Sequence, residues 1–337
     1  MKKFLSIMLS ALMAVSLFTA CRKDNSSSAS QRPEEAVTIR LGGLKGPTSM
    51  GMVKLLDDAE KGETANEIQF TMATTADELT PLFIKGDLDI IAVPANLGAV
   101  LYQKTEGNVQ FCAINTLGVL YIVENGDVTV KSIEDLKGKT ILATGQGSTP
   151  EMALTYLLAQ HGLTIGEDVT VEWKNETSEI LAEMTNRTGV IAMLPQPYVT
   201  VAGTKVENLN VVLDLTKEWQ DLDNGSMFIT AGLIVNKQFA REHPQALAKF
   251  LEEYKASTEY VNSNVEEAAG LVEKYDISVK YGVFGADMKI ALPRCNITYI
   301  DGEEMHKALE GYLQILFEQK PQSVGGEMPG RDFYYAG

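Results

Sequence analysis

Residues 132–161 read SIEDLKGKTILATGQGSTPEMALTYLLAQH, and this stretch decides the fold. Ser132 is placed to cap a short helix, and the apolar run at 140–144 is typical of a strand. A turn rich in Gly, Ser and Thr follows, and residues 151–161 then carry the apolar spacing of a helix that Gly162 closes. A strand, a short turn and a helix in this order predict one unit of an α/β domain with a parallel sheet.

The same alternation continues from this stretch in both directions along the chain. Toward the N-terminus, the pattern predicts strands at 37–44, 67–71, 89–93, 111–114 and 117–123 and helices at 50–59, 76–85 and 97–103. Toward the C-terminus, it predicts strands at 169–173, 189–194, 211–213 and 228–236 and helices at 177–185, 244–262, 265–275 and 302–319. The chain is therefore expected to be an α/β protein whose last part is mainly helical.

Two strand–turn–helix passages in this series resemble each other. Residues 41–52 read LGGLKGPTSMGM and residues 141–152 read ILATGQGSTPEM. Each places a Gly, a Pro and adjacent Ser or Thr residues at a helix start, and Thr48 or Ser49 is a plausible N-cap in the first. We interpret them as equivalent positions in two similar halves.

These two turns are candidate binding sites. A helix N-terminus leaves backbone N–H groups without helical partners and carries partial positive charge, so it suits a carboxylate, sulfonate or phosphate group. The hydroxyls of Thr48, Ser49, Ser148 and Thr149 add hydrogen-bonding groups. Ligands of open α/β sheets bind at the carboxyl ends of strands, which is where both turns lie. Plain helix capping is the alternative interpretation of each turn.

Three further polar residues follow predicted strands and share this expected face. They are Thr75, Asn96 and Gln196, of which the two amides are suited to orienting a polar ligand. The alternative for each is a hydrogen bond to the local backbone. Tyr198 is a candidate to stack on a ligand and Arg294 a candidate to reach an anion, although a solvated surface position is equally consistent with Arg294.

The N-terminal residues indicate export. Residues 1–20 combine two lysines with an apolar run that is shorter than the roughly 20 residues of a membrane-spanning helix, as in a signal peptide. The run ends before Cys21, which we predict to be lipidated and to become the mature N-terminus. Residues 21–35 are Ser-rich and charged, so they predict a flexible tether. The alternative is a secretory peptide followed by an incidental cysteine.

Composition excludes several classes of function. The formal net charge is −16, and it becomes −18 once the lysines of the signal peptide are removed, which argues against binding to nucleic acid. The three histidines are dispersed, so no metal site and no cofactor are expected. Motifs typical of hydrolases, zinc proteases and nucleotide-binding loops are absent from the sequence. Export would permit a disulfide between Cys112 and Cys295, but their apolar contexts favour two buried free thiols.

Taken together, these features resemble the periplasmic binding proteins of the second topological class, in the nitrate/sulfonate/taurine group with the SsuA/THI5-like domain. The resemblance rests on the Cys21 lipobox, on SIEDLKGKT at 132–140, on the strand, turn and helix at 141–152 and on GDLD at 86–89. It implies two Rossmann-like α/β lobes joined by a two-strand hinge, with lobe 1 at 36–118 plus 228–337 and lobe 2 at 119–227. The ligand contacts that it implies are Thr48, Ser49, Thr75, Asn96, Ser148, Thr149 and Gln196.

The resemblance also implies a role. The chain would be the palmitate-anchored, extracytoplasmic solute-binding component of an ABC importer, without catalytic activity, with the permease subunits and a small anionic or zwitterionic solute as its partners. Its alternatives are a heteroaromatic vitamin precursor such as the thiamine pyrimidine, an enzyme of the futalosine-pathway type on the same fold, and a surface sensor that contacts a receptor.

Overall fold

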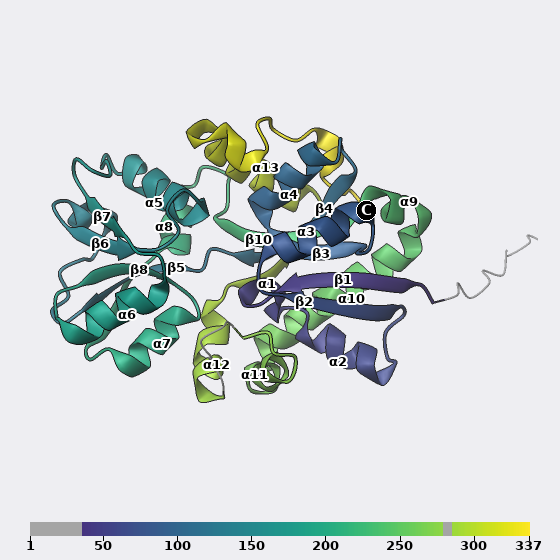
Figure 1. Ribbon diagram of the computed structural model, residues 1–337, viewed down its shortest axis with the longest axis horizontal. Helices are drawn as coiled ribbons and strands as arrows, with labels where there is room; N and C mark the ends of the chain where they lie inside the picture. Colours follow the sequence, from purple (N-terminus) through teal and green to yellow (C-terminus); the bar gives the residue numbers. More distant parts are fainter. Residues whose placement is uncertain (1–35, 279–284) are drawn as a thin grey trace, which may run out of the picture. The chain divides into compact units, whose positions relative to one another are not determined.

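The computed structural model describes residues 36–278 and 285–337 (Figure 1). The predicted signal peptide, the tether and Cys21 lie outside the described residues. Two β-sheets organise the described part of the chain, and helices pack on both faces of each sheet. The predicted α/β class and its two lobes of strands and helices are thereby confirmed.

The first sheet has six strands in the order β11-β4-β10-β3-β1-β2. Strands β1, β2 and β3 run parallel to one another, whereas β10 is antiparallel to both β3 and β4, and β11 is antiparallel to β4. The bounds are β1 (Thr38–Leu44), β2 (Glu67–Ala73), β3 (Ile90–Pro94), β4 (Val109–Leu117), β10 (Ile229–Asn236) and β11 (Ile297–Ile300).

The second sheet repeats this arrangement with five strands in the order β7-β6-β8-β5-β9. Strand β6 lies between parallel neighbours, as β1 does, and the antiparallel β5 occupies the place of β10. The two similar passages thus follow equivalent strands, β1 and β6, as predicted. The bounds are β5 (Leu120–Asn125), β6 (Thr140–Ala143), β7 (Thr170–Trp173), β8 (Ile191–Pro195) and β9 (Leu209–Asp214).

Helices connect the strands of each sheet and cover the sheet faces (Figure 1). The α-helices are α1 (Pro47–Met50), α2 (Val53–Lys61), α3 (Ala76–Lys85), α4 (Ala95–Lys104), α5 (Thr149–Gln160), α6 (Thr177–Asn186), α7 (Tyr198–Lys205), α8 (Leu215–Gln220), α9 (Lys237–Glu242), α10 (Pro244–Ser263), α11 (Val265–Lys274), α12 (Ala286–Ala291) and α13 (Gly302–Gln319). The 3-10 helices are η1 (Ile133–Leu136), η2 (Leu292–Arg294), η3 (Pro321–Val324) and η4 (Arg331–Phe333).

Strand β3 shows why its sequence is continuously apolar. Successive side chains of a strand point to opposite faces, so Ile90 and Ala92 enter the core beneath α2, α10 and α11, while Ile91 and Val93 enter the core beneath α3, α4 and α13. All four side chains are fully buried. A central strand covered on both faces has no polar face, as the sequence indicated.

The prediction of a single helix at 50–59 is wrong about where the helix starts. The structure has α1 and α2 instead, separated by Gly51 and Met52, and the N-cap of α1 is Gly46. Gly46 adopts a φ of 102°, which L residues rarely take, and Pro47 then supplies the backbone geometry of the first helical position. Thr48 and Ser49 therefore lie inside α1 and do not cap it.

The chain passes between the two sheets twice. The first passage is Gly118–Val119, between β4 and β5, and the second is the segment 221–228, between α8 and β10. The two passages touch, because a Cβ added to Gly118 would lie 2.2 Å from Phe228. The Gly118 carbonyl accepts hydrogen bonds from Thr216 Oγ1 at 2.7 Å and from Asn296 Nδ2 at 2.6 Å. Side chains from α8 and from the residue before β11 thus hold this one peptide.

The C-terminal segment 320–337 packs along the first sheet. Tyr334 forms a parallel bridge with Phe111 of β4, and the Tyr335 N–H donates to the Phe111 carbonyl at 3.0 Å. Asp332 is held by Lys237 and by the Tyr102 hydroxyl. These contacts fix the segment that follows α13.

Both described cysteines are free and buried, which confirms the favoured prediction. Burial raises the pKa of the Cys295 thiol to about 12 and also raises that of Cys112, so neither thiol is ionised near neutral pH. Within residues 36–278 and 285–337, no helix has the length and apolarity needed to cross a membrane.

Candidate functional site

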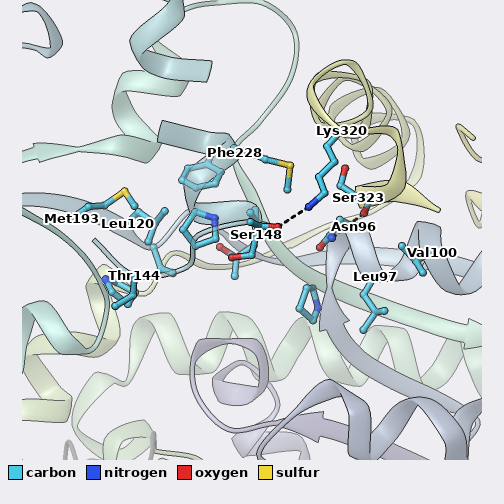
Figure 2. A pocket seen from close by; sticks show the side chains of 18 of the residues that line it. Asn96, Leu97, Val100, Leu120, Thr144, Ser148, Met193, Phe228, Lys320 and Ser323 are labelled. Carbon is cyan, nitrogen blue, oxygen red and sulfur yellow. Dashed lines mark hydrogen bonds between the residues drawn. The ribbon is translucent and has the colours of Figure 1, made fainter. Parts of the chain in front are cut away.

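A cavity of about 710 Å³ lies where strands of both sheets end. Pro94 at the end of β3, Thr144 just beyond β6 and Pro195 at the end of β8 all line it. The cavity therefore occupies the position at which open α/β sheets bind ligands, and its volume is in the range of sites for drug-sized molecules. Residues from both sheets and from the C-terminal segment form its walls (Figure 2).

The first turns of α4 form the wall on the side of the first sheet. Asn96, Leu97 and Val100 line the cavity from this helix (Figure 2). The Asn96 side chain donates from Nδ2 to the Ser323 carbonyl at 3.0 Å, which ties α4 to η3. Asn96 thereby keeps its Oδ1 as an acceptor beside the cavity.

The turn between β6 and α5 forms the facing wall. Gly145 and Gly147 adopt φ values of 89° and 76°, which bend the chain sharply before the helix. Ser148 is the N-cap residue of α5, and its hydroxyl donates to the Gly145 carbonyl at 2.6 Å. The Gly147 N–H donates to the Glu151 carboxylate at 2.6 Å. Ser148 and Thr149 line the cavity at the start of α5, where backbone N–H groups have no helical partners.

An apolar wall joins these two walls. Leu120, Met193 and Phe228 contribute to it (Figure 2). The Phe228 ring stacks on the fully buried Trp219 ring, with a centroid distance of 5.3 Å and an interplanar angle of 19°. Trp219 in turn donates from Nε1 to Ser226 Oγ at 2.9 Å. The aromatic wall is therefore supported from behind by a fixed indole.

Lys320 is the only charged side chain among the described residues that line the cavity. It follows the last residue of α13, and its ammonium group reaches across to the β6–α5 turn (Figure 2). Lys320 Nζ donates to the Gly147 carbonyl at 3.2 Å. This bond links the C-terminal segment to the second sheet.

The other predicted contact residues lie away from this cavity lining. Thr75 is exposed and caps α3, with its hydroxyl and N–H both bonded to Glu78. Thr48 is buried in α1. Ser49 Oγ and Gln196 Nε2 are buried polar atoms without a hydrogen-bond partner in the structure. A role of these four residues in binding stays a prediction.

Lys45, Arg294 and Tyr198 are not part of the cavity lining. Lys45 Nζ forms an ion pair with Asp276 at 2.5 Å. The Arg294 carbonyl accepts a hydrogen bond from the Tyr121 hydroxyl at 2.8 Å, which connects η2 to β5. Burial and the nearby Asp214 raise the pKa of Tyr121, so this hydroxyl remains a donor. Tyr198 begins α7 and is not part of the cavity lining.

Sequence reasoning missed Lys320, Ser323, Phe228 and Met193 as cavity residues. Lys320 and Ser323 lie beyond the last predicted helix, where no periodic pattern indicates a position. Phe228 was predicted only as the start of a strand, and Met193 as a residue inside one. No group of three or more potential ligands that could hold a metal ion occurs in the described part of the chain.

Comparison with known proteins agrees with this geometry. A family model described as NMT1/THI5 like matches residues 103–268. No curated protein matches the chain. The structure is similar to a crystal structure of an ABC transporter from Parabacteroides distasonis, with a TM-score of 0.73, 21% identity and coverage of 89% of this chain and 99% of that one.

Two further solved structures carry names of binding proteins. The periplasmic aliphatic sulphonate binding protein SsuA from Escherichia coli has a TM-score of 0.69 and 16% identity, with 88% of this chain and 92% of that chain covered. The periplasmic nitrate-binding protein NrtA from Synechocystis PCC 6803 has a TM-score of 0.52 and 14% identity, with 80% and 75% covered. These neighbours are binding proteins and not enzymes, in line with the prediction for this chain. The chain thus has the periplasmic-binding-protein fold, and its predicted resemblance to the SsuA/THI5-like group is confirmed.

Proposed function

We propose that this chain is the extracytoplasmic solute-binding component of an ABC importer and that it encloses a small anionic or zwitterionic solute of the sulfonate or nitrate kind. The single observation that carries the proposal is the cavity at the carboxyl ends of β3, β6 and β8. Its walls come from both sheets, so a bound solute would hold the two together. The fold shared with sulfonate- and nitrate-binding proteins supports the same role.

Within this proposal, the lobes have the boundaries that the sequence suggested, with 36–118 plus 228–337 in one and 119–227 in the other. Asn96, Ser148 and Thr149 contact the solute directly, since all three line the cavity. Closure by rotation of the lobes would take place about the passages at Gly118–Val119 and 221–228. Lipidation of Cys21 and a flexible tether at 21–35 would hold the protein near the permease subunits.

A neutral heteroaromatic solute, such as a thiamine-type pyrimidine, is a second candidate. The observation that favours it is the apolar part of the cavity lining, which includes the partly exposed side chains of Leu97, Val100 and Pro150. A pyrimidine would pack on these side chains without requiring an anion-binding group.

Ligand binding by the full-length chain tests the proposal. Native mass spectrometry of the purified protein should reveal a co-purified small molecule. A thermal-shift panel of sulfonates, nitrate, carboxylates and aminopyrimidines should contain at least one stabilising compound. At a concentration one hundred times Kd, a ligand stabilises the folded state by about 2.7 kcal/mol, which raises Tm by roughly 5 °C for a protein of this size. A panel in which nothing binds, together with an empty native spectrum, would contradict the proposed function.

A further inference from the structure

The composition of the cavity lining restricts the chemistry of the solute. Ten of the lining side chains are apolar or proline, and the polar ones apart from Lys320 are neutral. No Asp or Glu occurs among these described lining residues. A solute that carries an ammonium group would therefore lose hydration without meeting a carboxylate.

Lys320 supplies the charge that an anion requires. Its ammonium group has three donors, and the structure assigns one of them to the Gly147 carbonyl at 3.2 Å. Gly147 donates its own N–H to the Glu151 carboxylate, and Glu151 lies outside the lining. Ser148 and Thr149 line the same cavity and follow Gly147, the residue to which Lys320 is bonded.

The volume of the cavity indicates the rest of the solute. About 710 Å³ is far more than a nitrate ion fills, and the cavity lining includes the partly exposed apolar side chains of Leu97, Val100 and Pro150. An apolar body would cover these side chains and release water from them. The net charge of −16 repels anions at long range, so recognition has to be local to this lysine.

We propose that Lys320 is the residue that selects the charge of the solute and that the solute is an organic monoanion with an uncharged, apolar body. This inference rests on the proposed function and narrows it, because it excludes both inorganic anions and zwitterions as the preferred ligands. It also excludes the neutral heteroaromatic candidate. On binding, the anionic group of the solute takes the donors of Lys320 and bridges it to the start of α5.

Calorimetry on the full-length chain with three probes tests this inference. The probes are benzenesulfonate, its neutral analogue benzenesulfonamide, and taurine, which adds an ammonium group to a small sulfonate. The wild-type protein is expected to bind benzenesulfonate at least tenfold more tightly than either other probe. Lys320→Gln should weaken benzenesulfonate binding about tenfold or more, because a charge-assisted hydrogen bond is lost. The affinity for the neutral benzenesulfonamide should stay unchanged.

Two further variants separate recognition from a general change of charge. Lys320→Arg keeps the cation and should retain most of the affinity for benzenesulfonate. Lys104→Gln makes the same change of charge at an exposed residue of α4 that lies outside the cavity lining. This variant should bind benzenesulfonate as tightly as the wild-type protein does.

The outcomes distinguish this inference from the proposed function. Equal binding of benzenesulfonate by Lys320→Gln and the wild-type protein would overturn the role of Lys320 while binding itself stands. Preference of the wild-type protein for taurine, nitrate or the neutral probe would overturn the ligand class in the same way. Failure of the wild-type protein to bind any of these probes or any compound of the broader panel would instead remove the proposed function.

Discussion

Replacing Gly118 by alanine should destabilise the protein at the point where the two passages between the sheets meet. The new Cβ would lie 2.2 Å from Phe228 Cδ1 and 2.4 Å from Thr216 Oγ1. Carbon atoms in favourable contact are about 3.5–4.0 Å apart, so the Phe228 ring would have to retreat by more than about 1 Å. Trp219 stacks behind that ring and is itself fully buried, which leaves little room for the retreat.

The expected loss of stability follows from these contacts. Overpacking of a well-packed site costs about 1–3 kcal/mol, and loss of the hydrogen bond from Thr216 to the Gly118 carbonyl adds about 1 kcal/mol. We therefore expect a total of about 3 kcal/mol and a decrease in Tm of roughly 6 °C. Differential scanning fluorimetry and urea unfolding measure the two quantities independently.

A matched glycine variant provides the control for this measurement. Gly270 lies on the exposed side of α11, and a Cβ added there meets no atom within 4 Å. Gly270→Ala should stabilise the protein by about 0.5–1 kcal/mol, because alanine loses less backbone entropy in a helix. If Gly118→Ala melted within 1 °C of the wild-type protein while Gly270→Ala behaved as expected, the steric reasoning would be wrong.

Three other predictions concern single side chains. Asp57→Asn should lower the free energy of unfolding by about 1 kcal/mol at pH 7. Hydrogen bonds from Lys61 and Lys274 lower the pKa of Asp57, so its ionised form stabilises the fold above about pH 4. The difference between the variant and the wild-type protein in urea unfolding should therefore disappear as the pH falls below that value. Asn115→Leu should lower the free energy of unfolding by about 2 kcal/mol in the same assay. The buried Asn115 amide donates to the Thr48 carbonyl at 2.9 Å, and the variant removes this hydrogen bond. A decrease below 0.5 kcal/mol would contradict this reasoning. Ligand binding should change the fluorescence emission of Trp219, because Trp219 stacks on the cavity residue Phe228. Trp219→Phe should therefore abolish the change in emission, and Trp173→Phe should keep it. The reverse pattern would place the ligand elsewhere.

The sequence was sufficient to predict the α/β class and most regular elements. The prediction for α3 at 76–85 has the observed bounds, because a capping threonine, two acidic residues in the first turn and a C-terminal glycine all mark its ends. Short elements such as α12 and β11 were missed, since six or fewer residues show too little periodicity. The start of α1 was wrong because a glycine with positive φ took the role that was expected of Thr48 or Ser49.

The cavity was predictable only in part, for a physical reason. Asn96, Ser148 and Thr149 follow strands directly, so the rule that ligands bind at the carboxyl ends of strands finds them. Lys320 comes from a segment whose position depends on contacts between Asp332 and residues far away in the sequence. Such long-range placement leaves no local pattern in the chain.

The topology explains why the hinge and the apolar wall of the cavity share a residue. Strand β10 returns to the first sheet beside β4, and Ile229 pairs with Leu117 at the ends of these strands. The residues next to this pair, Phe228 and Gly118, are therefore neighbours in the two passages between the sheets. Phe228 is almost fully buried, packs against Gly118 and also belongs to the cavity lining. Under the proposed function, this one side chain would connect the cavity to both passages between the sheets.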